Sequence, residues 1–134
     1  MASGEIDTLQ ICYNFCYQHP CCLINPRAGT IWRAKEQGMG VITMRTLTSG
    51  LFQRTMAAAG GPSSESFDAN AFLLTYVLSN PLVNVALVGM RRVEEVERNV
   101  SVADTAERLD LEGLHHRFPL SPANRTMERE GNDT

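Results

Sequence analysis

The stretch at residues 40–50 shows the pattern of the chain, with a short apolar run, Gly40-Val41-Ile42-Thr43-Met44, and then Arg45-Thr46-Leu47-Thr48-Ser49-Gly50. The first five residues are apolar or β-branched without a helical stripe, as is typical of a strand buried on both faces of a parallel sheet. The next six are mostly small or polar and favour a turn. We therefore predict a strand over Gly40–Met44 that opens directly into a loop.

Two further strands are predicted on either side of this one. Residues 6–13, Ile-Asp-Thr-Leu-Gln-Ile-Cys-Tyr, and residues 83–88, Val-Asn-Val-Ala-Leu-Val, have the same character, and Gly89 follows the second. Between the first two strands, Asn25-Pro26 is a typical helix start and Gly38 a left-handed stop after Gln37.

A second connecting helix follows a loop at residues 57–66, whose glycine and serine content indicates a mobile connection. Asp68 can cap this helix and Asn80-Pro81 ends it. Its apolar positions recur at i, i+3, i+4, i+7 and i+8. They are Ala69, Phe72, Leu73, Tyr76 and Val77.

The C-terminal part is predicted to contain two more helices. The first follows Gly89 and has Val93, Val96 and Val100 on one face, with Glu94, Glu95, Glu97 and Arg98 mostly on the other. The second starts at Asp110 and carries Leu111, Leu114 and Phe118. Residues 119–134 are polar and contain too little apolar surface to order themselves, so we predict one domain over residues 1–118 and a disordered tail.

Strand and helix thus alternate three times, which predicts an α/β fold with a parallel sheet. A complete (β/α)8 TIM barrel takes about 250 residues, so 134 residues hold about half of one. Its inward faces, expected to include Leu9, Ile11, Val41, Ile42, Val85 and Leu87, would lack an opposite wall. A small open doubly wound sheet is the alternative that periodicity leaves open.

Composition excludes several classes of protein. The formal net charge of −3 argues against a broad electrostatic interface with nucleic acid. No apolar run approaches the roughly 20 residues that span a bilayer, and the N-terminal residues do not resemble a signal peptide. A cytoplasmic location is therefore expected.

The four cysteines lie close together, at Cys12, Cys16, Cys21 and Cys22. A disulfide framework would spread its cysteines over the chain, and a zinc site would show two separated pairs. We expect free thiols and no metal site.

Two loops at the carboxyl ends of predicted strands contain arginine side chains. Ligands of parallel α/β folds bind at those ends of the strands. The loop over residues 45–50 combines Arg45 with small residues whose backbone N–H groups can approach a pyrophosphate. The sequence Gly89-Met90-Arg91-Arg92 places two guanidinium groups at a helix N-terminus, which suits a phosphate. The alternatives are a plain loop and a solvated helix start.

Four segments together resemble the C-terminal part of the aldo/keto reductase barrel. The segment at 88–99, Val-Gly-Met-Arg-Arg-Val-Glu-Glu-Val-Glu-Arg-Asn, is similar to the family's final strand-to-helix signature. Residues 34–50 are similar to its seventh strand and the approach to it, 7–14 to its sixth strand, and 72–81 to the helix before the eighth. The resemblance covers residues 5 to 118 and implies strands six to eight of a partial barrel with a C-terminal helix.

The resemblance also implies a set of NADP(H)-binding residues. Gln10 would bind the nicotinamide carboxamide, and Met44 would pack on the ring where the family often has an aromatic residue. Arg45, Leu47 and Gly50 would border the pyrophosphate. Gly89 would lead the last turn, with Arg91 or Arg92 at the 2′-phosphate and Glu95 and Asn99 at the adenine. Without the resemblance, Gln10 is interpreted as a hydrogen-bonded polar residue inside a barrel, and Met44 as a residue that fills the core.

The family draws its catalytic Asp, Tyr, Lys and His from its first four strands, which this chain does not match. Thr46 and Arg98 stand where the family commonly has proline and glutamate, so a less rigid loop is expected at Thr46. The resemblance implies the NADP(H)-binding part of an oxidoreductase whose full form reduces carbonyls by hydride transfer, without catalytic residues of its own. The partners implied are NADP(H) and either the missing N-terminal half-barrel or a second copy of the chain. A non-catalytic nucleotide-binding or protein-interaction module is the alternative.

Overall fold

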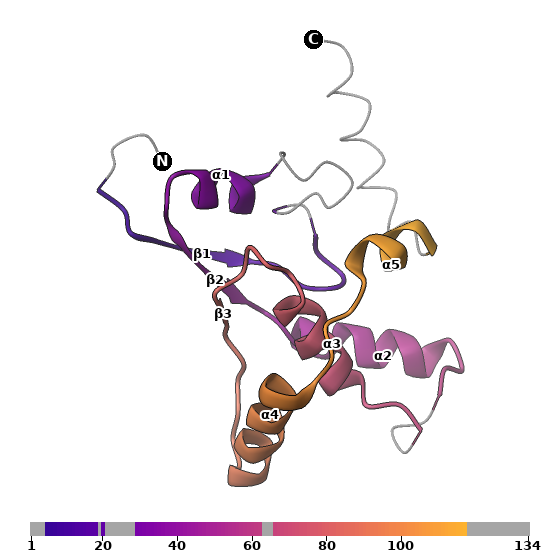
Figure 1. The fold of residues 1–134 in the computed structure, drawn as a ribbon. Helices are drawn as coiled ribbons and strands as arrows, with labels where there is room; N and C mark the ends of the chain where they lie inside the picture. Colours follow the sequence, from indigo (N-terminus) through magenta and orange to yellow (C-terminus); the bar gives the residue numbers. More distant parts are fainter. Residues whose placement is uncertain (1–4, 19, 21–28, 63–65, 118–134) are drawn as a thin grey trace.

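The computed structural model describes residues 5–18, 20, 29–62 and 66–117, and its elements alternate as the sequence predicts (Figure 1). The strands are β1 (Thr8–Cys12), β2 (Gly40–Met44) and β3 (Val85–Ala86). The helices are α1 (Thr30–Glu36), the 3-10 turn η1 (Thr48–Gly50), α2 (Leu51–Ala58), α3 (Ala69–Leu78), α4 (Val93–Thr105) and α5 (Leu111–Arg117). The predicted α/β class is confirmed.

The three strands form one parallel sheet in the order β1-β2-β3. Leu9 pairs with Val41, and Ile42 pairs with Val85. Asn84 extends the second pairing, since its backbone N–H donates to the Val41 carbonyl (3.0 Å) and its Oδ1 accepts from the Val41 N–H (2.9 Å). Strand order therefore follows chain order, without the reversal that creates a doubly wound sheet.

Helices α1 and α3, which lie between successive strands in the chain, pack on the same face of this sheet. Val41 is fully buried there against Ile31 of α1 and Tyr76 of α3. Leu9, Ile11 and Ala86 pack against the same cluster, which is the main core.

The other face of the sheet carries Ile42, Met44, Val85 and Leu87, of which the last three are exposed. We call it the open face. The expectation that Leu9, Ile11 and Val41 share a face with Ile42, Val85 and Leu87 was wrong, because side chains alternate along a strand and the register pairs Leu9 with Val41 but Val85 with Ile42.

The predicted helix ends are largely confirmed. Asp68 caps α3, with its Oδ1 accepting from the Ala71 N–H (3.0 Å), and Gly38 has the left-handed φ of 73° that follows α1. The buried face of α3 is wider than the predicted stripe, since Leu74 is also buried. The predicted start at Asn25-Pro26 lies outside the described residues, and α1 begins after Gly29.

Other boundaries differ from the sequence prediction. Helix α2 was not predicted, and it includes Ala57 and Ala58 of the expected loop. Its Phe52 stacks on Phe72 of α3 and meets the edge of Phe15, which explains why this segment is ordered. Strands β1 and β3 are shorter than predicted.

The last two helices sit beside α3. Arg98 of α4 forms an ion pair with Asp68 at the start of α3. Asp110 accepts a hydrogen bond from the Gly113 N–H (3.0 Å) at the start of α5, and Leu111 joins the core. Phe118 and the predicted tail at 119–134 lie outside the described residues.

Candidate functional site

The loops after β2 and β3 begin at one edge of the sheet and are joined there. The Leu87 N–H donates to the Thr43 carbonyl (2.8 Å), and Thr46 Oγ1 donates to the Leu87 carbonyl (2.8 Å). Thr46 is buried. The expectation of a less rigid loop at Thr46 stays a prediction, and the Thr46 hydroxyl ties this loop to the residue that follows β3.

The loop after β2 is tightly wound. Arg45, Thr48 and Ser49 have φ of 59°, 56° and 53°, and Gly50 has φ of 77°. Only glycine adopts such angles without cost, and each of the others costs about 1–3 kcal/mol. Strain of this kind concentrates at functional sites and is held there by surrounding contacts.

Asn14, which the sequence analysis did not single out, supplies one of those contacts. Its Nδ2 donates to the Arg45 carbonyl (3.0 Å), which also accepts from the Thr48 N–H (2.8 Å). Asn14 is buried just beyond β1. Its position after a strand end was the available signal, since buried amides are almost always hydrogen-bonded.

Leu47 and Gly50 complete the turn into α2. The Leu47 carbonyl accepts from the Gly50 N–H (3.2 Å), and Gly50 is the N-cap residue of α2. A Cβ at Gly50 would lie 3.1 Å from Arg54 Nη1, which is the end of an exposed side chain and can move, so it is the φ angle that favours glycine.

Gln10 and Met44 lie on the open face in neighbouring strands. Gln10 Nε2 contacts Met44 Sδ at 3.6 Å, and Met44 is 37% exposed. Cys12 pairs directly with Met44 in the register. The open face therefore presents an amide and a thioether side by side, near the edge where the two loops begin.

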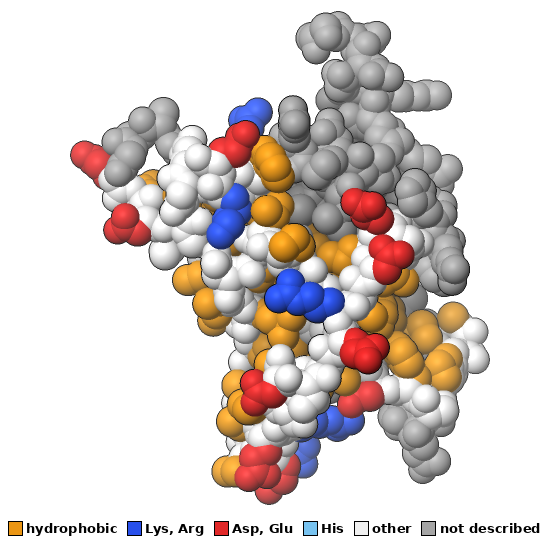
Figure 2. Space-filling view, in the orientation of Figure 1, with side chains coloured by type: hydrophobic (Ala, Val, Ile, Leu, Met, Phe, Trp, Pro, Cys, Tyr) orange, Lys and Arg blue, Asp and Glu red, His pale blue; other side chains and the backbone are white. Residues whose placement is uncertain are grey.

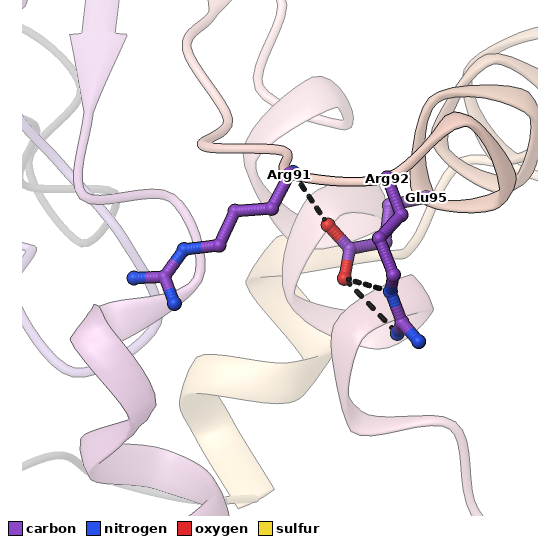
Figure 3. A network of polar contacts seen from close by, with 3 residues as sticks. All are labelled: Arg91, Arg92 and Glu95. Carbon is purple, nitrogen blue, oxygen red and sulfur yellow. Dashed lines mark hydrogen bonds and ion pairs between the residues drawn. The ribbon is translucent and has the colours of Figure 1, made fainter.

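The start of α4 brings Arg91, Arg92 and Glu95 together (Figure 3). Glu95 Oε2 accepts from the Arg91 backbone N–H (2.8 Å), and Glu95 Oε1 accepts from Arg92 Nε and Nη2 (3.2 Å each). The first of these contacts holds the pKa of Glu95 below its ordinary value, and the Arg92 side chain adds to the effect.

The Arg91 side chain is placed differently. Figure 3 shows its guanidinium directed away from Glu95, and it forms no ion pair with any described residue. Asn99 lies one turn beyond Glu95 and is half-buried beside it. Gly89 is exposed, and a Cβ there would meet nothing within 4 Å, so sterics do not require this glycine.

The predicted site residues thus form three groups. They are Gln10 with Met44, Arg45 with Leu47 and Gly50, and the segment from Gly89 through Arg91, Arg92 and Glu95 to Asn99. Within the described chain, no hydrogen bond links Arg91 or Arg92 to the loop after β2. The hydrogen bond between Thr46 and Leu87 links the second and third groups only where their loops leave β2 and β3.

Two of the tyrosines lie in the core, and one free thiol, that of Cys12, lies on the open face in the strand beside Met44. Tyr13 and Tyr76 are fully buried and their rings stack, with centroids 6.0 Å apart. Cys12 and Cys16 are free thiols, and burial raises the pKa of the Cys16 thiol. Cys21 and Cys22 lie outside the described residues.

In the parts of the chain that the structure describes, no three metal-ligating side chains gather. None of the helices described has the length and apolar character needed to cross a membrane. No known family model matches this chain, and no curated protein does either.

Proposed function

We propose that this chain is the C-terminal, NADP(H)-binding portion of an aldo/keto reductase-like oxidoreductase. The sheet architecture supports the proposal. Three parallel strands in sequential order, with their helices on one face, are the arrangement of consecutive units in a partial (β/α)8 barrel. The open face would then be the barrel interior, and the loops after β2 and β3 would lie at its carboxyl-terminal rim.

The donor set of the two loops fits a dinucleotide phosphate. Arg45, Arg91 and Arg92 are exposed, and Arg91 leaves its guanidinium available to a ligand. Guanidinium groups at a helix N-terminus match phosphate oxygens in charge and geometry. The joining of the two loops through Thr46 and Leu87 is the observation that carries the proposal, because it places both loops at one edge.

The chain's own residues would bind and orient the cofactor. Gln10 would hydrogen-bond the carboxamide, and Met44 would pack on the nicotinamide ring from the neighbouring strand. Arg45, Leu47 and Gly50 would border the pyrophosphate, Arg91 or Arg92 would pair with the 2′-phosphate, and Glu95 and Asn99 would approach the adenine. The bound nicotinamide supplies the hydride for carbonyl reduction.

Isothermal titration with NADPH and NADH tests this function. The wild-type chain should bind NADPH more tightly, because only NADPH carries the 2′-phosphate. Arg91→Ala should lower NADPH affinity at least about tenfold and leave NADH affinity unchanged, since a charge-assisted contact is worth about 1.5–3 kcal/mol. Arg33→Ala, at an exposed position on α1, is the matched control. Equal affinities for both nucleotides in every variant would contradict the proposal.

A non-catalytic protein-interaction module is the second candidate. One observation favours it, since Val93, Val96 and Val100 of α4 are exposed by 69%, 42% and 54%. An apolar stripe in that position is suited to binding another protein.

A further inference from the structure

The exposed face of α4 carries a regular apolar stripe. Val93, Val96, Val100 and Ala103 follow one another at intervals of three, four and three residues, and all four are exposed. This is the a/d spacing of core positions in a two-stranded coiled coil. Val93 and Val100 take the a positions, and Val96 and Ala103 take the d positions. The stripe therefore has the periodicity of a helix that pairs with another helix.

The contacts of α4 with its own chain use a different face. Glu95 and Val102 are half-buried, and Arg98 pairs with Asp68 at the start of α3. At 100° per residue, these positions lie at least about 120° around the helix from the centre of the valine stripe. The stripe thus stays available after α4 has packed on the rest of the molecule.

The two flanks of the stripe differ in charge. Arg92 and Asn99 border it on one side, and Glu97 and Asp104 border it on the other. A parallel helix pair brings opposite flanks together, so that Arg92 of one copy meets Glu97 of the other. An antiparallel pair brings the two acidic flanks together, where like charges repel.

We propose that the chain forms a homodimer in which α4 packs in parallel against α4 of a second copy. Charge complementarity favours a second copy of the chain as the partner, because α4 itself supplies both the basic flank and the acidic flank that a parallel helix pair needs. The Arg92 side chain is 73% exposed and uses two of its five donors on Glu95, so it can also meet a carboxylate across the interface.

The segment that leads into α4 extends this surface. Met90, two residues before the N-cap residue Arg92, is exposed by 42%. Figure 2 shows hydrophobic side chains along the side of the molecule where the chain runs from β3 to the start of α4 (Figures 1 and 2, left). Met90 adds apolar area at the N-terminal end of the helix pair, where a stripe of two heptads alone would bind weakly.

Light scattering after size exclusion tests the dimer. The wild-type chain should show twice the 14.8 kDa mass of one chain, with dissociation on dilution. Val100→Lys should raise the dissociation constant at least about tenfold, because the ammonium would be buried unpaired. Ser101→Lys introduces the same side chain one position along the helix, away from the stripe, and should leave the mass unchanged.

The direction of the helices has its own test. Glu97→Lys should weaken the dimer, because the new charge would face Arg92 of the partner in a parallel pair. Glu107→Lys makes the same charge change beyond α4 and is the control. Val93→Cys and Val100→Cys should each give a crosslinked homodimer on mild oxidation, in excess of any that the wild-type cysteines form.

Three results would overturn the proposal. They are a wild-type monomer at every concentration, a dimer that Val100→Lys does not weaken, and a dimer that Glu97→Lys leaves unchanged or tightens. The third would show an antiparallel or unrelated interface.

Discussion

Thr46 and Leu87 join two loops that are 41 residues apart in the chain, through a hydrogen bond of 2.8 Å from the Thr46 hydroxyl to the Leu87 carbonyl. The hydroxyl is buried, and the loop that contains it has left-handed residues on both sides, at Arg45 and Thr48. The bond therefore holds a strained loop against the end of β3. Both loops of the candidate nucleotide site depend on this contact for their relative position.

Replacing this hydroxyl should destabilise the fold. Thr46→Val leaves the Leu87 carbonyl without its donor and should lower the free energy of unfolding by about 1–2 kcal/mol, measured by urea denaturation. Thr55→Val removes an exposed hydroxyl that bonds only within α2, so it should change stability little. A Thr46→Val protein as stable as the wild type would show that the contact does not hold the loop.

The carboxyl group of Glu95 should titrate below the ordinary glutamate pKa. The Arg91 backbone N–H lowers this pKa most, and the Arg92 side chain lowers it further against the opposing effect of desolvation. A lowered folded-state pKa gives a stabilising contribution that is present above the ordinary pKa and lost as the pH falls through the lowered value. The contact at the start of α4 should therefore survive at neutral pH and open in acid.

Arg92→Ala tests which donor matters most. The backbone N–H of Arg91 is unaffected by this change, so the pKa of Glu95 should stay lowered in carboxyl-detected NMR titration. A return to the ordinary value of about 4.3 in Arg92→Ala would assign the effect to the Arg92 side chain instead.

Carbonyl reduction should be absent from the isolated chain. The open face, where Gln10 and Met44 lie, carries no tyrosine, histidine or lysine among its described residues, so the usual proton donors of carbonyl reduction are missing from it, and the ionisable group that β1 places there is the Cys12 thiol. Following NADPH absorbance with a panel of aldehydes should give the rate of the protein-free control. Turnover that Arg91→Ala reduces would show that the chain has an acid of its own.

The sequence predicted the positions of the strands and helices more accurately than it predicted which face of each strand is buried. Strand β2 has the predicted bounds, and the Asp68 cap and the Gly38 stop are confirmed, because these signals are local. Helix α2 was missed, since its order comes from ring contacts of Phe52 with residues of other elements. The prediction that Leu9 and Ile11 share a face with Val85 and Leu87 was wrong. In a strand that is apolar on both sides, the sequence does not reveal which alternate residues face the helices.

The candidate site was predicted only in part. The residue types after each strand indicated anion-binding loops, and the structure places those loops at one edge. The buried Asn14 and the anchoring contact of Thr46 depend on tertiary hydrogen bonds that residue spacing does not indicate. The contact of Glu95 with the Arg91 N–H likewise depends on side-chain geometry at the start of α4.

Chemical-shift mapping of the backbone and side-chain amides during titration with NADPH tests the central claim most directly. If the loops after β2 and β3 form one nucleotide site, NADPH should shift the Gln10 side-chain amide together with the backbone amides of Ser49, Gly50, Arg91 and Arg92. NADH should shift Gln10 and the loop after β2 but should perturb Arg91 and Arg92 less. No shifts at saturating NADPH, or shifts confined to residues away from this edge of the sheet, would contradict the account.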